Sequence, residues 1–226
     1  MQQINVIKIK KMKNNIYVII LNNKSNINKM NDRGYLKVIL GPMFSGKTTE
    51  LIRIYRRYSA CNVPVCVINH ISDKTRYSTD NMSSHNHEEI TSYNFEKLYH
   101  CLEDDFVHKV KVILINEGQF FEDLIDVVDI LVNVYNKEVY VCGLDGDFKR
   151  QKFGKILDLI PNCDDVIKLK ALCRNCCKSD ALFTYRLSNE KEQTVVGVDN
   201  YISLCRKCYN NNEKEKHLRN ISKLSI

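Results

Sequence analysis

The segment that most constrains the fold is the loop from Gly41 to Thr48, with the sequence Gly-Pro-Met-Phe-Ser-Gly-Lys-Thr. A glycine, four free positions and Gly-Lys-Thr make up the phosphate-loop pattern. Such a loop joins a buried strand to a helix, and the flanks agree: Tyr35 to Leu40 is an apolar run, and Thr48 to Tyr58 has apolar residues at helical spacing. A chance match in a glycine-containing turn is the alternative, and these flanks argue against it. The chain is therefore predicted to bind a nucleoside triphosphate.

The loop also indicates how the nucleotide is held. Backbone N–H groups and the positive end of the helix dipole hold phosphates, Lys47 is expected to neutralise the β and γ phosphates, and Thr48 to offer its hydroxyl to Mg2+. The loop residues expected to contact the nucleotide are Gly41, Pro42, Met43, Phe44, Ser45, Gly46, Lys47 and Thr48. Kinases, ATPases and GTPases share this loop, so it does not distinguish them. Met43 and Phe44 are bulky for a simple switch and are expected to face a planar substrate, unless they merely pack.

Beyond the loop, short apolar runs alternate with helical segments, which is typical of a parallel sheet covered by helices. Further strands are predicted at Val63 to Asn69, Val110 to Ile115 and Val139 to Leu144, and a helix at about Phe121 to Val134. The polar segment from His70 to Thr91 is predicted to be a long surface loop. The fold class is therefore α/β, with a P-loop parallel sheet, flanking helices and a small β-rich lobe after them.

Four regions are expected along the chain: a leader (1–33), an α/β domain (34–162), a β-rich lobe (163–209) and a polar, frayed tail (210–226). The leader has seven basic residues and one acidic residue, and so carries +6 of the net charge of +7. We expect it to be a solvated, disordered segment, although a basic tail also suits nucleic acid. Its apolar stretch, Ile16 to Leu21, is too short to span a membrane, which takes about 20 residues.

The predicted strand from Val110 to Ile115 ends in two polar residues, Asn116 and Glu117. Open α/β sheets bind their ligands at the carboxyl ends of the strands. A glutamate near a transferring phosphate can accept the proton of a substrate hydroxyl, so Glu117 is the candidate catalytic base. The alternative is that Glu117 is only a turn or capping acid for the next helix.

Four of the ten cysteines form two Cys-x-x-Cys pairs, Cys173 with Cys176 and Cys205 with Cys208, and 28 residues separate the pairs. Four thiolates at this spacing predict a tetrahedral structural zinc site that leaves no position open for catalysis. Cys177 is an alternative to Cys176 but lacks the two-residue spacing. The other cysteines show no paired spacing, which indicates a reducing compartment, cytoplasm or nucleus, rather than a disulfide scaffold.

Taken together, these motifs resemble the cytosolic (type II) thymidine kinases, cellular or of poxviruses and other large DNA viruses. The resemblance runs from about Gly34 to Tyr209 and leaves out the leader and the tail. It is carried by five motifs in order: Leu40-Gly-Pro-Met-Phe-Ser-Gly-Lys-Thr-Thr-Glu-Leu51, Thr75-Arg-Tyr-Ser78, Glu117-Gly-Gln-Phe-Phe121, Leu144-Asp-Gly-Asp-Phe148 with Phe153-Gly154, and the two cysteine pairs.

The resemblance implies an ATP-dependent thymidine kinase that phosphorylates the 5'-hydroxyl of thymidine or deoxyuridine in pyrimidine salvage. It also implies Mg2+, structural zinc, a cytoplasmic location and a homotetramer. Residues 34–162 would be the kinase domain, and residues 163–209 a zinc-binding domain with a lasso loop that closes over the base, mostly through backbone hydrogen bonds.

The resemblance also assigns site residues. Glu117 matches the catalytic base. Beyond the phosphate loop, the residues matched to ATP are Asp73, Arg76, Asn116, Gly118 and Gln119. The residues matched to the nucleoside are Met43, Phe120, Leu144, Phe148 and Phe153, and, in the lasso loop, Glu192, Gln193, Thr194, Val195, Val196 and Tyr201.

Three positions depart from the family pattern: Asn116 stands where the family has an Asp that supports Mg2+, Val196 where it has a glycine, and Lys152 where it has a proline. An amide oxygen can ligate a cation but lacks the charge of a carboxylate. A catalytically impaired nucleotide-binding relative is therefore the second hypothesis, after an active kinase.

A third hypothesis is a zinc-ribbon nucleic-acid binder with a P-loop ATPase. It would use the basic residues beside the cysteines, which are Arg174, Lys178, Arg206 and Lys207. The near-neutral charge outside the leader argues against it. The expected partner is a small-molecule nucleoside, not nucleic acid or a membrane.

Overall fold

The computed structural model describes residues 6–11, 17–21, 33–74, 81–83, 89–190, 192–193 and 198–224. The chain divides into two compact units, Met1–Asp32 and Arg33–Ile226. In the first unit, β1 (Val6–Lys11) and β2 (Tyr17–Leu21) form an antiparallel pair. These two strands differ from the disordered leader that was expected. The reason is local composition, since Val and Ile in both segments, and Tyr17 in the second, favour strands.

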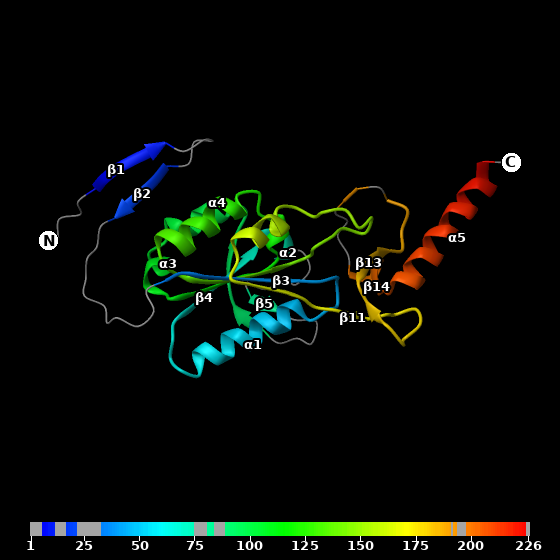
Figure 1. Cartoon of the computed structure of the whole chain (residues 1–226), viewed down its shortest axis with the longest axis horizontal. Coiled ribbons are helices and arrows are strands. Elements are labelled where there is room, and N and C mark those ends of the chain that lie inside the picture. The colour runs from blue at the N-terminus through cyan, green and yellow to red at the C-terminus, as the bar shows by residue number, and fades with distance from the viewer. Residues whose placement is uncertain are drawn as a thin grey trace. The chain divides into compact units, whose positions relative to one another are not determined.

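The second unit is built on a six-stranded sheet in which every neighbouring pair of strands is parallel (Figure 1). In their spatial order the strands are β10 (Asp165–Lys168), β3 (Tyr35–Leu40), β9 (Glu138–Gly143), β8 (Val112–Ile115), β4 (Val65–His70) and β7 (Tyr93–Phe95). The α/β prediction is therefore confirmed. The four predicted strands occupy the centre, because strands buried on both faces read as continuous apolar runs.

The two edge strands, β7 and β10, were not predicted. β10 falls within the residues that the sequence analysis assigned to the lobe, so the sheet extends to Lys168 and not only to residue 162. Its apolar signal is weak because Asp165 and Lys168 leave only two apolar residues in the strand. Side-chain hydrogen bonds help to fix this edge: the Tyr35 hydroxyl donates to Asp165 (2.5 Å), and the backbone N–H of Leu36 donates to Asp164 (2.8 Å).

Helices cover both faces of the sheet (Figure 1). On one face, α1 (Lys47–Ser59) buries Leu51 and Ile52 against Ile39 and Leu114. The opposite face is covered by η1 (Leu98–Leu102), α3 (Asp105–Lys109), α4 (Leu124–Asp129) and the 3-10 helix η4 (Ile156–Asn162). A π-helical turn, η3 (Ile130–Val134), continues α4, and the two together match the predicted helix over about 121–134.

The predicted long loop after β4 contains short regular elements in the part that the structure describes. They are α2 (Ile71–Lys74), followed by β5 (Asn81–Ser83) and β6 (Glu89–Thr91), which pair antiparallel. A further short 3-10 helix, η2 (Gly118–Phe120), follows β8.

The lobe after β10 is small and β-rich, as predicted. Its elements are β11 (Ala171–Leu172) paired with β12 (Asp180–Ala181), β13 (Phe183–Arg186) paired with β14 (Tyr201–Leu204), η5 (Val198–Asn200) and α5 (Arg206–Leu224). The expected frayed tail is instead the continuation of α5 to Leu224. Good helix formers such as Glu213 to Lys216 explain this difference.

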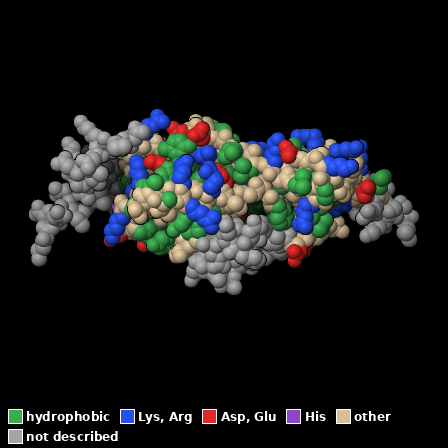
Figure 2. Space-filling model, turned by 90° about the horizontal axis from the view of Figure 1, so that it is seen from below, with side chains coloured by type: hydrophobic (Ala, Val, Ile, Leu, Met, Phe, Trp, Pro, Cys, Tyr) green, Lys and Arg blue, Asp and Glu red, His purple; other side chains and the backbone are tan. Residues whose placement is uncertain are grey.

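On the surface in Figure 2, Lys and Arg side chains are spread across the face of the second unit rather than gathered into one continuous band. Within the described residues, no helix has both the length and the apolar character needed to cross a membrane.

Leu114 provides a test of the core. It lies in the central strand β8, is fully buried and packs beneath α1. We expect Leu114→Ala to lower the free energy of unfolding by about 2–5 kcal/mol, because truncation leaves a cavity. Chemical denaturation followed by circular dichroism measures this change. Leu218→Ala, at an exposed position of α5, is the control and should change stability by less than about 0.5 kcal/mol. Equal losses in both variants would contradict this core.

Candidate active site

The predicted site segments all follow strands that end at the same edge of the sheet. The register sets Leu40 of β3 opposite Gly143 of β9, and Ile115 of β8 opposite Val141 of β9. The phosphate loop after β3, Glu117 after β8 and the Leu144 segment after β9 therefore leave the sheet side by side. This edge is where open α/β sheets bind ligands.

The phosphate loop has an unusual backbone. Gly46, directly before α1, has a φ of 81°, and Phe44 has a φ of 64°. Left-handed residues in a turn produce concave arrangements of backbone N–H groups that bind anions. Phe44 is strained in this conformation because it carries a Cβ. At Gly41, a Cβ would lie 2.6 Å from Ser45 Oγ and 2.7 Å from the Leu169 carbonyl oxygen, so only glycine fits there.

Two polar side chains of the loop suit an anionic ligand. Lys47 is buried, and its Nζ donates to the carbonyl of Pro42 within the loop (2.8 Å). Ser45 Oγ is buried, and among the buried side-chain polar atoms of the described residues it is the one without a hydrogen-bond partner. Buried polar atoms normally have partners, so a ligand oxygen is a natural one for this hydroxyl. Thr48 lies half-buried in the first turn of α1, next to Lys47.

Glu117 stands in a strained turn at the end of β8, with φ 52° and ψ 42°. Gln119 fixes its carboxylate: Nε2 of Gln119 donates to Glu117 Oε2 (2.5 Å), while Oε1 accepts from the backbone N–H of Leu144 (3.0 Å). Gln119 thus joins the turn after β8 to the segment after β9. Its side-chain amide is engaged inside the protein, whereas the sequence analysis assigned Gln119 to ATP.

Glycines allow this turn to pack tightly. A Cβ at Gly154, which has a φ of 57°, would lie 2.0 Å from the carbonyl oxygen of Gln119, and a Cβ at Gly143 would lie 2.2 Å from Gln119 Oε1. A Cβ at Gly118 would lie 2.7 Å from a methyl group of Val141. The position of Gln119, and with it that of Glu117, therefore depends on three residues that lack side chains.

Asn116 is buried in a neutral hydrogen-bond network. Its Nδ2 donates to Asn69 Oδ1 (3.0 Å), and its Oδ1 accepts from the Cys142 thiol (3.1 Å). The network joins the ends of β4, β8 and β9. Sequence reasoning missed both partners. Asn69 closes a predicted strand, where a polar residue after an apolar run was the available signal, and Cys142 is one of the cysteines without paired spacing.

The residues matched to the nucleoside outside the lasso loop lie together. Four buried residues and three partly buried residues form an apolar cluster separate from those of the sheet: Met43, Leu144, Phe153 and Tyr201, with Phe44, Phe120 and Phe148. The rings of Phe120 and Phe153 meet edge to face, with centroids 5.5 Å apart. The phosphate loop contributes Met43 and Phe44, so it borders both the anion site and this cluster. Glu192 and Gln193 are exposed and lie outside the cluster.

His70, at the end of β4, was not predicted to take part in the site. Its ring lies 4.8 Å from that of Phe121 and 5.4 Å from that of Phe120. Burial lowers the pKa of His70, which favours a neutral ring. Nδ1 accepts from the Ser72 N–H, so Nε2 carries the proton that it shares with the Glu96 carbonyl. His70 supports the aromatic residues that follow Glu117.

Some predicted residues cannot be placed. Arg76, Thr194, Val195 and Val196 lie outside the described residues, and of Asp73 only the backbone, in α2, is described. Their roles stay predictions.

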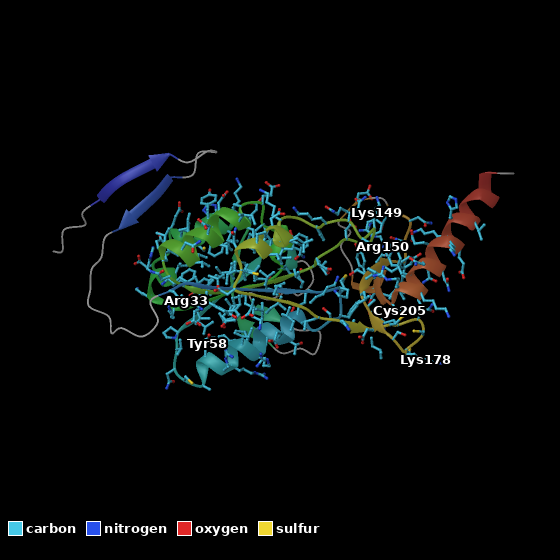
Figure 3. All side chains as sticks on the ribbon, viewed as in Figure 1. Arg33, Tyr58, Lys149, Arg150, Lys178 and Cys205 are labelled. Carbon is cyan, nitrogen blue, oxygen red and sulfur yellow. The ribbon has the colours of Figure 1, made fainter. Side chains whose placement is uncertain are left out.

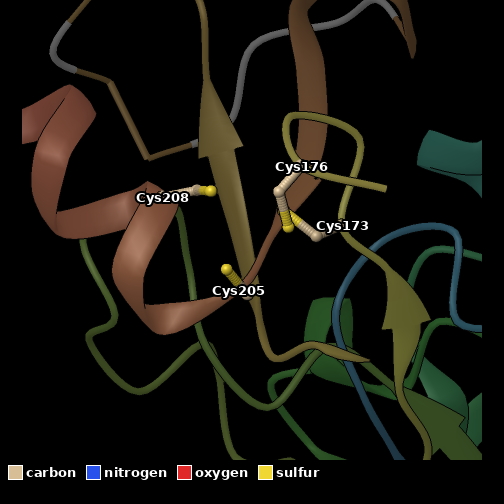
Figure 4. A group of neighbouring side chains, drawn as sticks. All are labelled: Cys173, Cys176, Cys205 and Cys208. Carbon is tan, nitrogen blue, oxygen red and sulfur yellow. The ribbon is translucent and has the colours of Figure 1, made fainter. Parts of the chain in front are cut away.

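The four predicted metal ligands come together (Figure 4). The sulfur atoms of Cys173, Cys176, Cys205 and Cys208 lie within 4.8 Å of one another. Sulfurs bound to one zinc ion at about 2.3 Å are about 3.8 Å apart, so a small closure would complete the site. Cys177 is exposed, and its thiol faces the Arg174 carbonyl (4.0 Å), which settles the choice in favour of Cys176.

The chemistry of the four thiols also fits a cation. Burial opposes ionisation of Cys173, but hydrogen bonds from the backbone N–H groups of Cys176, Cys205 and Asn175 lower its pKa to about 6. Burial and the neighbouring sulfurs raise the pKa of Cys208 to about 12. Four thiolates this close repel one another unless a cation balances them, and a zinc ion would supply that balance.

Comparison with known proteins supports the geometry. Residues 34–209 match the family model described as thymidine kinase. The thymidine kinase of sheeppox virus is 39% identical over 179 residues, which are 79% of this chain and 98% of that protein. The human cytosolic thymidine kinase is 44% identical over 181 residues, 78% of this chain and 74% of that protein. The variola virus thymidine kinase is 42% identical over 177 residues, 78% of this chain and 97% of that protein.

The cysteine cluster predicts the metal content of the purified protein. We expect about one zinc ion per chain by plasma mass spectrometry, because four thiolates form a closed tetrahedral site. Cys176→Ser should lose most of the zinc, and Cys177→Ser, which changes the neighbouring exposed thiol, should keep it. Retention of zinc by Cys176→Ser, or its loss from Cys177→Ser, would show that the ligand set is different.

Proposed function

The chain belongs to the thymidine kinase family, and we propose that it transfers the γ-phosphate of ATP to the 5'-hydroxyl of thymidine. Membership supports thymidine kinase activity, a step of nucleotide salvage. ATP as the donor in this reaction, Mg2+ as its cofactor and deoxyuridine as a second acceptor are our proposals. So are a homotetramer and a cytoplasmic location, the latter because relatives are named cytosolic.

One observation supports the proposal above all others. The anion-binding loop, a carboxylate in a strained turn and an apolar, aromatic cluster lie at one edge of one sheet. The loop suits the phosphates of a donor, and the carboxylate can remove a hydroxyl proton. The apolar cluster suits a flat nucleobase. Met43 and Phe44 of the loop belong to the cluster, so donor and acceptor would meet there.

We assign the following steps to residues of this chain. The phosphate loop and Lys47 hold the phosphates and balance their charge, and Ser45 Oγ donates to a phosphate oxygen. Glu117 accepts the proton of the 5'-hydroxyl while the 5'-oxygen of thymidine bonds to the γ-phosphorus. The bond between the γ-phosphorus and the oxygen that bridges it to the β-phosphorus breaks, and ADP leaves with the electrons of that bond. Gln119 orients the Glu117 carboxylate. Mg2+, held by Thr48 and supported by Asn116, would neutralise the β and γ phosphates.

The nucleobase is proposed to lie in the apolar cluster. Phe148 and Phe153 would provide ring faces, and Met43, Leu144 and Tyr201 the remaining walls. The loop between β13 and β14, with Glu192 to Val196, would close over the base through its backbone. We also propose two functional parts, an α/β part that ends with β10 and a metal-binding lobe that follows it.

An impaired relative remains the alternative, and Asn116 is the observation that favours it. The Asn116 oxygen carries no full charge and already accepts from Cys142, so it offers Mg2+ less than a carboxylate does. The alternative retains nucleotide and nucleoside binding but predicts little turnover.

Glu117→Gln tests the catalytic base. The substitution keeps the shape of the side chain and an oxygen that can accept from Gln119, but removes the basic carboxylate. We expect kcat for thymidine to fall by about 10²- to 10⁴-fold, with little change in the KM for ATP. Glu122→Gln, at an exposed position nearby, should keep the parent kcat. An unchanged kcat in Glu117→Gln would exclude Glu117 as the base.

Asn116→Asp separates the active enzyme from the impaired relative. Asn69 can rotate its amide and donate to the new carboxylate, so the fold should be kept. We expect the parent to phosphorylate thymidine, and the variant to reach its half-maximal rate at about tenfold less Mg2+, because the carboxylate adds a full charge. If only the variant phosphorylates thymidine, the parent is the impaired relative. Coupled assays of ADP release at a series of Mg2+ concentrations measure the rate of each protein and the Mg2+ concentration that gives its half-maximal rate.

A further inference from the structure

Arg186 in β13 is a buried cation with an unusual set of partners. Its side chain is almost fully buried, and within the described residues no carboxylate pairs with it. Its guanidinium donates to the Tyr201 hydroxyl (2.6 Å from Nη2) and to the backbone carbonyls of Glu190 (3.2 Å), Glu192 and Gln193 (2.9 Å). Burying an unpaired charge is costly unless its donors are satisfied, so this arrangement indicates a specific role.

The guanidinium also stacks on two rings of the apolar cluster. Its central carbon lies 3.7 Å from the ring centroid of Phe148 and 5.1 Å from that of Tyr201. Arg186 thus links the backbone of the loop between β13 and β14 to two walls of the proposed nucleoside pocket. Because it binds this loop through carbonyl groups, the contact fixes the path of the chain.

Asp147 makes a second link between the same loop and the turn after β9. It is buried, and its Oδ1 accepts from the backbone N–H groups of Lys149 (2.8 Å) and Gln151 (2.9 Å), which close the turn. Its other oxygen, Oδ2, accepts from Nε2 of Gln193 (3.0 Å). The Gln193 side chain is therefore directed at Asp147.

The turn that carries Asp147 and Phe148 also contacts the metal-binding lobe. The Tyr209 hydroxyl donates to the Phe148 carbonyl (2.6 Å), and the Arg150 guanidinium lies 4.5 Å from the Tyr209 ring centroid. Tyr209 directly follows the predicted metal ligand Cys208. In Figure 3, Lys149 and Arg150 lie at the same end of the second unit as Cys205. A continuous path of contacts thus joins the metal ligands, the turn and the loop.

We propose that Arg186, Phe148, Asp147 and Gln193 form a latch that holds Glu190, Glu192 and Gln193, in the described part of the loop after β13, in place before the nucleoside binds, and that this latch sets nucleoside affinity. The inference rests on the proposed function, since it takes Phe148 and Tyr201 as walls of the nucleoside pocket. Arg186, Asp147 and Gln193 are positioning residues, which do not touch the reacting atoms. Loss of the latch raises the cost of ordering the loop and weakens nucleoside binding, while the phosphate loop and Glu117 keep their geometry.

The Asp147–Gln193 pair allows a test with matched variants. Gln193→Glu sets a second carboxylate against Asp147 and breaks the latch. Asp147→Asn keeps it, because the new amide can still accept from the turn and can donate to Gln193 after that amide rotates. In the double variant, the new amide donates to the new carboxylate, which restores the link. Gln193 is exposed, so its substitution does not disturb the core, and Asp147→Asn keeps the size of the buried side chain.

Two readouts follow: the thymidine Kd by isothermal titration calorimetry, and amide hydrogen exchange of Leu187 to Gln193 without ligands. We expect Gln193→Glu to weaken thymidine binding about tenfold and to speed exchange, and the other two variants to stay within about threefold of the parent. The Kd for ATP should not change in any of them. Calorimetry needs no turnover, so an inactive parent would refute the proposed function without deciding on the latch.

Two results with Gln193→Glu would overturn the latch. One is parent-like exchange in Gln193→Glu, which would mean that the pair does not hold the loop. The other is faster exchange with an unchanged thymidine Kd, which would mean that the loop does not set affinity. Failure of the double variant to recover would also count against it, because the restored hydrogen bond would then have no effect.

Discussion

Parallel pairing of β3, β9 and β8 is the constraint on which the rest of the site depends. Parallel strands end at the same edge, so three chain segments that are distant in sequence leave the sheet next to one another. The first segment carries the phosphate loop, the second Asn116 and Glu117, and the third Leu144 to Phe148. Each needs only a short local turn to reach the others. This explains why the polar chemistry lies in loops while the strands themselves remain apolar.

The second requirement is rigidity at that edge, and close packing supplies it. Gly143 and Gly154 let the backbone approach Gln119 to distances that a Cβ would prevent, and Gln119 then holds the Glu117 carboxylate. The lobe supports the phosphate loop as well, because the Met43 N–H donates to Thr184 of β13 (3.0 Å). The apolar core of this small lobe includes the four cysteines, so a metal ion bound there would stabilise the lobe and its support of the site.

The sequence predicted what local pattern encodes. The central strands were recognised because they are continuous apolar runs, and the metal ligands and the phosphate loop because their spacing is fixed by chemistry. The edge strands β7 and β10 were not predicted, because polar residues shorten their apolar runs: Asn94 in β7, and Asp165 and Lys168 in β10. The contacts of Arg186, Asp147 and Asn69 could not be predicted from the sequence for another reason. Their partners lie far away in the sequence, and a buried polar residue reveals its role only when the fold brings the partner to it.

The hydrogen-bond partners of Asn116 change how the replacement of the family Asp by Asn is interpreted. Judged against the family pattern, it is the loss of a carboxylate from the metal site. Within the fold, it is a neutral residue that satisfies Asn69 and Cys142 at a fully buried position. A carboxylate there would be costly to bury whenever no cation balances it, whereas an amide is not. If Mg2+ binds here as proposed, Asn116 would therefore favour a stable empty site over strong attraction for the metal. In the proposed reaction, Lys47 and the backbone of the phosphate loop would then have to balance more of the charge of the transferring phosphate.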